Sequence, residues 1–194
     1  MSGSFFKYQR RYLHSILIPQ SSLDTENKKG SKCGYNPKKP GRTSHHPLMA
    51  FIANTRMVAN SWLRSGNTGT VNGANEFLDE TEDILGHHTI GMLRADSGFF
   101  SGKFLSHVEN KGLNYIVAVR MNPIIKRQIH DLKSWITEAE GIDVAEYSYK
   151  AMPWDKPRRM VVIRQRIEDR PNACGKYLFD IKTYRYQTWV TNMT

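Results

Sequence analysis

The stretch Thr89-Ile90-Gly91-Met92-Leu93-Arg94-Ala95-Asp96-Ser97-Gly98-Phe99-Phe100 is the best guide to the fold of this chain. Its apolar first half is typical of a buried strand, and that strand runs directly into one carboxylate, Asp96. Ser97 and Gly98 then turn the chain into an amphipathic segment. In open α/β sheets, ligands and catalytic groups gather at the carboxyl ends of strands. Asp96 is therefore either a metal ligand at a sheet edge or the cap of the following helix.

The segments on both sides of this strand alternate between helical and strand patterns. Residues 71–85 predict a helix, because their apolar residues share one face: Ala74, Phe77, Leu78, Thr81, Ile84 and Leu85. The acids of this helix fall elsewhere and are interpreted as a solvated face. A second helix, capped by Ser101 and followed by Gly112, precedes a strand over 113–119. This alternation predicts parallel pairing and an α/β layer architecture.

The remaining segments predict a change of architecture along the chain. Residues 12–19 predict a short buried strand, whereas the apolar segment 47–63 does not discriminate between helix and strand. A short helix is expected over 123–135, followed by strands at 144–149, 159–167 and 184–191. We therefore predict an α/β core over residues 1–135 and a β-rich subdomain over residues 136–194.

The composition of the chain indicates which kinds of partner and which cellular compartment to expect. The chain has 194 residues, 39% of them hydrophobic, and a formal net charge of +10, which suits a polyanionic partner such as nucleic acid. Its two cysteines, Cys33 and Cys174, form neither a disulfide framework nor a zinc-binding spacing. No apolar run has the length of a membrane span. We expect a cytoplasmic protein with no membrane partner.

Residues 21–44 form a polar segment rich in Lys, Gly and Pro, which is typical of a loop or hairpin tip. Its candidate DNA-binding residues are Lys28, Lys29, Lys32, Lys38, Lys39 and Arg42. These side chains suit phosphate contacts, and they suit a solvated basic loop equally well.

Four motifs in the same order resemble the DDE transposases of bacterial insertion sequences, in the branch classed as transposase DDE domain group one. They are Gly34-Tyr35-Asn36-Pro37-Lys38-Lys39-Pro40-Gly41-Arg42, Ser44-His45-His46-Pro47-Leu48, Trp62-Leu63-Arg64-Ser65-Gly66-Asn67 and Arg94-Ala95-Asp96-Ser97-Gly98-Phe99. The resemblance implies an RNase H-like fold: a mixed sheet with flanking helices, and a β-rich insertion between the second and third acidic residues. It also implies a bacterial, cytoplasmic enzyme that binds DNA at element ends and target, and it allows a homo-oligomer.

The same resemblance implies that Asp96 is the second of three acids that hold Mg²⁺, for which Mn²⁺ can substitute. Phosphodiester cleavage and joining need a stabilised leaving oxygen, which divalent cations held by carboxylates supply. With this support, the metal-ligand interpretation of Asp96 is preferred to the helix cap.

The sequence departs from the family at the other two acids. Where the first Asp is expected, the chain has Gln20, which offers no anionic ligand, and Asp24 is the alternative candidate. The third acid would fall after Thr194. We therefore expect the C-terminal part of the fold to be missing, and the chain to be a transposase fragment with little or no strand-transfer activity. The alternatives are a non-catalytic nucleic-acid-binding protein and the product of a remnant reading frame.

Two other groups of residues invite a functional interpretation. The pairs His45-His46 and His87-His88 rarely supply two ligands to one ion, because adjacent side chains diverge. Arginines and aromatics alternate over 154–189 and could follow a nucleic-acid backbone. Ordinary alternation on a half-buried sheet explains this second pattern better.

Overall fold

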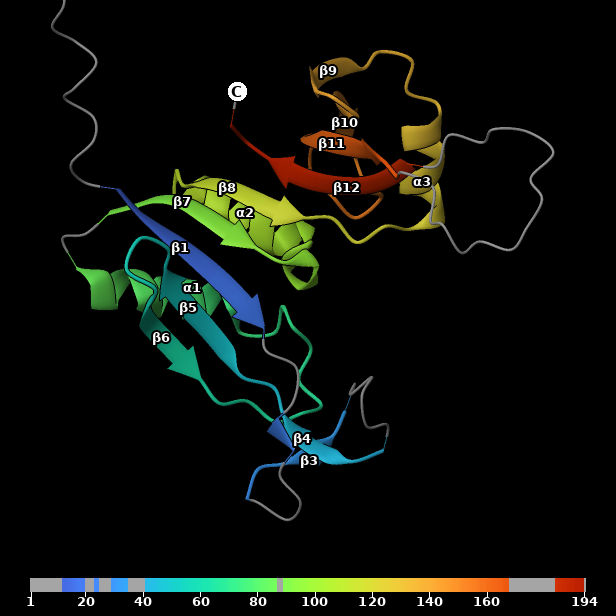
Figure 1. Cartoon of the computed structure of the whole chain (residues 1–194). Coiled ribbons are helices and arrows are strands. Elements are labelled where there is room, and N and C mark those ends of the chain that lie inside the picture. Colours follow the sequence, from blue (N-terminus) through green and yellow to red (C-terminus); the bar gives the residue numbers. More distant parts are fainter. Residues whose placement is uncertain are drawn as a thin grey trace, which may run out of the picture.

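The structure is a computed structural model, and it describes residues 12–19, 23–24, 29–34, 41–86, 89–167 and 184–193. Within them, nine strands form one mixed sheet in the order β6-β5-β1-β7-β8-β12-β11-β10-β9 (Figure 1). A separate small sheet has the order β2-β4-β3. Every helix in these residues is too short or too polar to cross a bilayer.

The strands of the large sheet are β1 (Tyr12–Pro19), β5 (Leu48–Ile52), β6 (Met57–Trp62), β7 (Thr89–Ala95), β8 (Asn114–Ala118), β9 (Ile136–Ala139), β10 (Ile142–Tyr149), β11 (Arg158–Arg166) and β12 (Tyr184–Thr191). The small sheet consists of β2 (Leu23–Asp24), β3 (Lys32–Cys33) and β4 (Thr43–His45). The helical elements are α1 (Ala74–Leu85), η1 (Ser97–Phe99, a 3-10 turn), α2 (Gly102–Asn110) and α3 (Pro123–His130). The segment 47–63 is thus a hairpin of two strands, β5 and β6.

The pairing of the central strands confirms the predicted α/β architecture. Strands β1, β7 and β8 are parallel neighbours, and α2 connects β7 to β8. All other neighbouring strands of the large sheet are antiparallel. Parallel neighbours need such a crossover connection, whereas α3 lies beside the antiparallel strands of the other half, near β12 (Figure 1).

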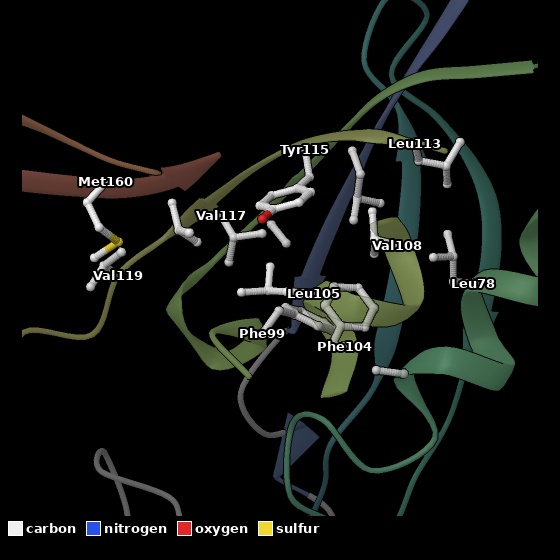
Figure 2. Packing of buried hydrophobic residues seen from close by; sticks show 14 of the residues in the cluster. Leu78, Phe99, Phe104, Leu105, Val108, Leu113, Tyr115, Val117, Val119 and Met160 are labelled. Atoms are coloured by element: carbon white, nitrogen blue, oxygen red, sulfur yellow. The ribbon is translucent and has the colours of Figure 1, made fainter. Parts of the chain in front are cut away.

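Alternating apolar residues of β8 pack against the helices to form the core. Figure 2 shows Tyr115 and Val117 of β8 beside Leu105 and Val108 of α2, and all four side chains are fully buried. The predicted apolar face of α1 is confirmed for Phe77, Leu78 and Thr81, which are also buried. Ile84 differs from the prediction: it lies in the last turn of α1 and remains 56% exposed.

The β-rich strands extend the large sheet. Strand β12 pairs antiparallel with β8, with Val190 opposite Val117, and β11, β10 and β9 follow outward. Side chains strengthen this junction, because the Thr191 hydroxyl donates to the Tyr115 carbonyl oxygen at 2.7 Å. The division of the chain at residue 135 stays a prediction.

Candidate active site

Asp96 lies at the carboxyl edge of the parallel strands. Leu17 of β1 pairs with Ala95 of β7, so the carboxyl ends of these parallel strands lie at the same edge of the sheet, and β1 extends two residues further. Asp96 is the first residue after β7, and Pro19 is the last residue of β1. This edge is where open α/β sheets place ligands, as the sequence predicted for Asp96.

The Asp96 carboxylate is exposed and only partly occupied by protein contacts. Its Oδ1 accepts a 2.8 Å hydrogen bond from the Gly98 amide and thereby caps η1. Its Oδ2 accepts no hydrogen bond from the described residues. Partial loss of water raises the pKa of Asp96 above its usual value, although the Gly98 amide and the nearby His46 act in the opposite direction. The cap and the metal-ligand interpretations are therefore compatible, since each uses a different oxygen.

Gly98 permits this arrangement because a side chain there would collide with its surroundings. A Cβ on Gly98 would lie 2.6 Å from Thr70 Cγ2 and 3.0 Å from Asp96 Oδ1. The loop that contains Thr70 therefore packs directly against the turn that holds the carboxylate.

A cavity of about 400 Å³ opens beside this turn. Its lining residues are Thr70, Ser97, Gly98, Phe100, Arg120, Met121 and Asn122. Arg120 comes shortly after β8, the parallel neighbour of β7, and its side chain is exposed. The cavity thus brings a cation next to the turn of Asp96, which suits a phosphate group. Arg120 is not among the site residues predicted from the sequence, although it follows an apolar strand just as Asp96 does.

His46 is held on the other side of the same loop. Its ring nitrogen Nδ1 lies 2.8 Å from the Thr68 carbonyl oxygen. Its backbone amide donates to the Arg64 carbonyl at 2.8 Å, and its own carbonyl accepts from Arg64 Nε at 3.2 Å. Arg64 Nη1 also donates to the carbonyl oxygens of Thr70 and Asn72. The motif around Arg64 is therefore a scaffold for the loop between His46 and Gly98.

The glycines of two sequence motifs join the small sheet to this scaffold. A Cβ on Gly34 would lie 1.9 Å from the Gly66 carbonyl oxygen, and a Cβ on Gly66 would lie 2.3 Å from the Ser44 carbonyl oxygen. Gly34 and Gly66, which are 32 positions apart in the chain, therefore meet by direct backbone packing.

The structure partly locates the other candidate site residues. The backbone of Asp24 in β2 pairs with Ser44 in β4, so it lies near His46, but its side chain is outside the described residues. Its role as a ligand stays a prediction, and Gln20 is also outside the described residues. Lys29, Lys32 and Arg42 are exposed on or beside the small sheet. Lys28, Lys38 and Lys39 fall outside the described residues.

The part of the chain that the structure describes contains no cluster of three or more His, Cys, Asp or Glu residues suited to a metal ion. The donor chemistry of Asp96 still fits one hard cation, because Mg²⁺ is usually held by one or two carboxylates and completes its shell with water and substrate phosphates. Two acids of α1 are engaged elsewhere: Asp79 and Glu82 pair with Lys111 at 2.7 and 2.6 Å.

Two arginines of the β-rich part, Arg158 and Arg164, make structural contacts. Arg158 is buried and pairs with Glu109 of α2. The guanidinium carbon of Arg164 lies 4.0 Å from the ring centre of Trp135, and its Nε pairs with Asp143 at 2.7 Å. Packing within the protein therefore occupies these two side chains, whereas the interpretation of the whole alternating segment stays a prediction.

Comparison with known proteins identifies the family. The sequence model of the family described as transposase DDE domain group 1 matches residues 34–193. No curated protein sequence matches the chain. Among solved structures, the chain is similar to the piggyBac transposase in its synaptic complex with hairpin DNA, with a TM-score of 0.53 and 14% identity. The similarity covers 94% of this chain and 33% of that chain, so this chain spans about a third of its length. The fold is therefore that of a transposase, and the chain belongs to the transposase DDE domain group 1 family.

Proposed function

We propose that this chain is part of a DNA transposase that cuts and joins DNA by metal-dependent phosphoryl transfer, with Asp96 as a metal ligand. The observation that carries the proposal is the position of Asp96, at the shared carboxyl edge of β1 and β7 with Oδ2 unbonded in the described residues. On this proposal, strands β6-β5-β1-β7-β8 with α1 and α2 form an RNase H-like core, and residues 136–194 form an insertion.

In the proposed chemistry, Asp96 and Arg120 at this edge of the sheet have different roles. Asp96 would hold Mg²⁺ through Oδ2, while its Oδ1 stays fixed by the Gly98 amide. The bound ion would stabilise the negative charge that develops on the attacking and leaving oxygens. Arg120, on the wall of the adjacent cavity, would bind a non-bridging phosphate oxygen and orient the strand.

DNA is the proposed partner, at element ends and target, and the small sheet is its proposed contact. Lys29, Lys32 and Arg42 are exposed there, and the net charge of +10 favours a polyanion. Lys28, Lys38 and Lys39 belong to the same basic segment of the sequence. The piggyBac transposase, whose fold this chain shares, was solved with hairpin DNA.

We also propose that the chain alone has little strand-transfer activity, which the lack of any group of three or more His, Cys, Asp or Glu residues suited to a metal ion among the described residues supports. A plasmid cleavage and joining assay with Mg²⁺ or Mn²⁺ tests this point. Robust turnover that Asp96→Ala abolishes would overturn the proposed inactivity.

The alternative function is a non-catalytic nucleic-acid-binding protein, which the capping role of Asp96 Oδ1 favours. Fluorescence anisotropy with a DNA duplex separates the two. The transposase proposal expects Mg²⁺ to change the affinity for DNA, and expects Asp96→Asn to remove that response. An affinity for DNA that changes neither with Mg²⁺ nor with Asp96→Asn would support the alternative.

A further inference from the structure

We propose that His46 is a second ligand of the cation held by Asp96, and that its imidazole makes the site favour Mn²⁺ over Mg²⁺. The inference rests on the proposed function, because it presupposes a cation at Asp96. It gives a metal-binding role to one residue of the pair His45-His46, for which the sequence pattern favoured a structural role.

The sheet register places both residues at the carboxyl end of β1. On one side, β5 begins at Leu48, which pairs with Pro19, and His46 lies two residues before Leu48. On the other side, β7 ends at Ala95, which pairs with Leu17, and Asp96 follows. His46 and Asp96 therefore lie on either side of the end of the same strand.

The loop over residues 68–70 connects the two side chains. The His46 ring is bonded to the Thr68 carbonyl, while Thr70 packs against Gly98, whose amide binds Asp96 Oδ1.

The contact with Thr68 determines which ring nitrogen is available. A carbonyl oxygen only accepts hydrogen bonds, so Nδ1 of His46 must be the protonated nitrogen. In the neutral ring, Nε2 then carries a lone pair, and it has no hydrogen-bond partner among the described residues. Metal-binding histidines commonly show this arrangement, in which one ring nitrogen donates to a carbonyl and the other binds the ion.

The backbone of His46 is also prevented from moving. The His46 amide donates a hydrogen bond to the Arg64 carbonyl oxygen, and Arg64 Nε donates one to the His46 carbonyl oxygen. The preceding residue, His45, is buried at 6% exposure, so the two rings have separate environments. One histidine of the pair thus supports the fold and the other is available to the site.

The expected preference for Mn²⁺ follows from ligand chemistry. Carboxylate oxygen binds Mg²⁺ and Mn²⁺ well, whereas imidazole nitrogen favours transition metals over Mg²⁺. A site of one carboxylate and one imidazole should therefore discriminate between the two ions more strongly than a carboxylate alone.

The test measures metal binding in the absence of turnover, using the full chain without a histidine tag. Mn²⁺ affinity is measured by the loss of the free-ion electron paramagnetic resonance signal, and Mg²⁺ affinity by competition. His46→Asn is the informative variant, because the Asn amide can still donate to Thr68 while no atom replaces Nε2. His130→Asn is the matched control, since the His130 side chain is 90% exposed on α3.

We expect His46→Asn to weaken Mn²⁺ binding about tenfold or more, to change Mg²⁺ binding much less, and to leave the melting temperature near that of the wild type. His130→Asn should change none of these. Equal Mn²⁺ affinity in His46→Asn and wild type, with weakened binding in Asp96→Asn, would overturn the role of His46 and leave the proposed function intact. Metal binding that survives Asp96→Asn would instead overturn the proposed function itself.

Discussion

Arg158 of β11 and Glu109 of α2 form a two-point ion pair, with Nε 2.8 Å from Oε1 and Nη2 2.9 Å from Oε2. The Tyr115 hydroxyl donates to the same Oε1 at 2.7 Å, so strand β8 takes part as well. The pair is largely shielded from water, with side-chain exposures of 2% for Arg158 and 10% for Glu109. It therefore ties the β-rich strands to the helical layer.

Glu109→Gln should remove a pH-dependent contribution to stability. Burial raises the pKa of Glu109, but hydrogen bonds from Arg158, Tyr115 and Lys156 outweigh it and leave this pKa below its usual value. A carboxyl group whose pKa is lower in the folded state than in the unfolded state stabilises the folded protein at pH values above its unfolded-state pKa. That contribution is lost as the pH falls below about 5 and through the folded-state pKa. Urea unfolding between pH 7 and pH 3 should show a flatter stability profile in the variant.

At pH 7 the same variant leaves the buried Arg158 with Asp155, 3.2 Å from its Nη2, in place of the paired Glu109 carboxylate, and we expect a loss of up to about 3 kcal/mol in unfolding free energy. Glu138→Gln is a suitable control, because Glu138 is exposed on β9. Identical pH profiles for Glu109→Gln and wild type would show that the ion pair contributes nothing to acid sensitivity.

Gly98→Ala should displace the Asp96 carboxylate. The new Cβ would lie 2.6 Å from Thr70 Cγ2, so either the turn or the loop must shift. We expect Mn²⁺ affinity to fall about tenfold, a loss typical of disturbed support around a metal ligand. Adding Thr70→Ser removes the clashing methyl group and should restore part of the affinity. Failure of the double variant to recover any binding would contradict this steric explanation.

Gly66→Ala should loosen the small sheet from the scaffold. Its Cβ would meet the carbonyl oxygens of Ser44 and Lys32 at 2.3 and 2.6 Å, and neither backbone can move independently. We expect a loss of about 1–3 kcal/mol in thermal unfolding, as for other overpacked sites. Gly69→Ala is the control, because its Cβ would make only ordinary contacts with Asn72 from 3.5 Å. Equal melting temperatures of the two variants would argue against close packing at Gly66.

The double variant Lys29→Ala/Lys32→Ala should bind DNA more weakly, and its affinity for DNA should depend less on salt concentration. Each lost phosphate contact should reduce the slope of log affinity against log salt concentration by about one. Anisotropy titrations between low and moderate salt measure this slope. Lys133→Ala removes an exposed lysine outside the small sheet and should leave the slope unchanged. A double variant with the wild-type slope would exclude this surface as the DNA contact.

Local sequence patterns predicted much of the secondary structure, because such patterns report on each segment by itself. The alternation around Asp96 indicated parallel pairing, and the structure confirms it for β7 and β8. Ser101 does precede α2, and Gly86 does end α1. The segment 47–63 stayed ambiguous because its apolar residues fit both periods, and only pairing with β1 makes it a hairpin.

The candidate site depends on contacts that local sequence patterns do not predict. The amino-acid sequence by itself determined that one carboxylate follows a buried strand and that a basic segment precedes it, since both depend on neighbours in the chain. Tertiary structure alone decided that Asp96 shares its surroundings with His46 and the cavity lined by Arg120. Those residues are 50 and 24 positions away from Asp96. Their proximity depends on strand order and glycine packing between distant segments, which no local pattern encodes.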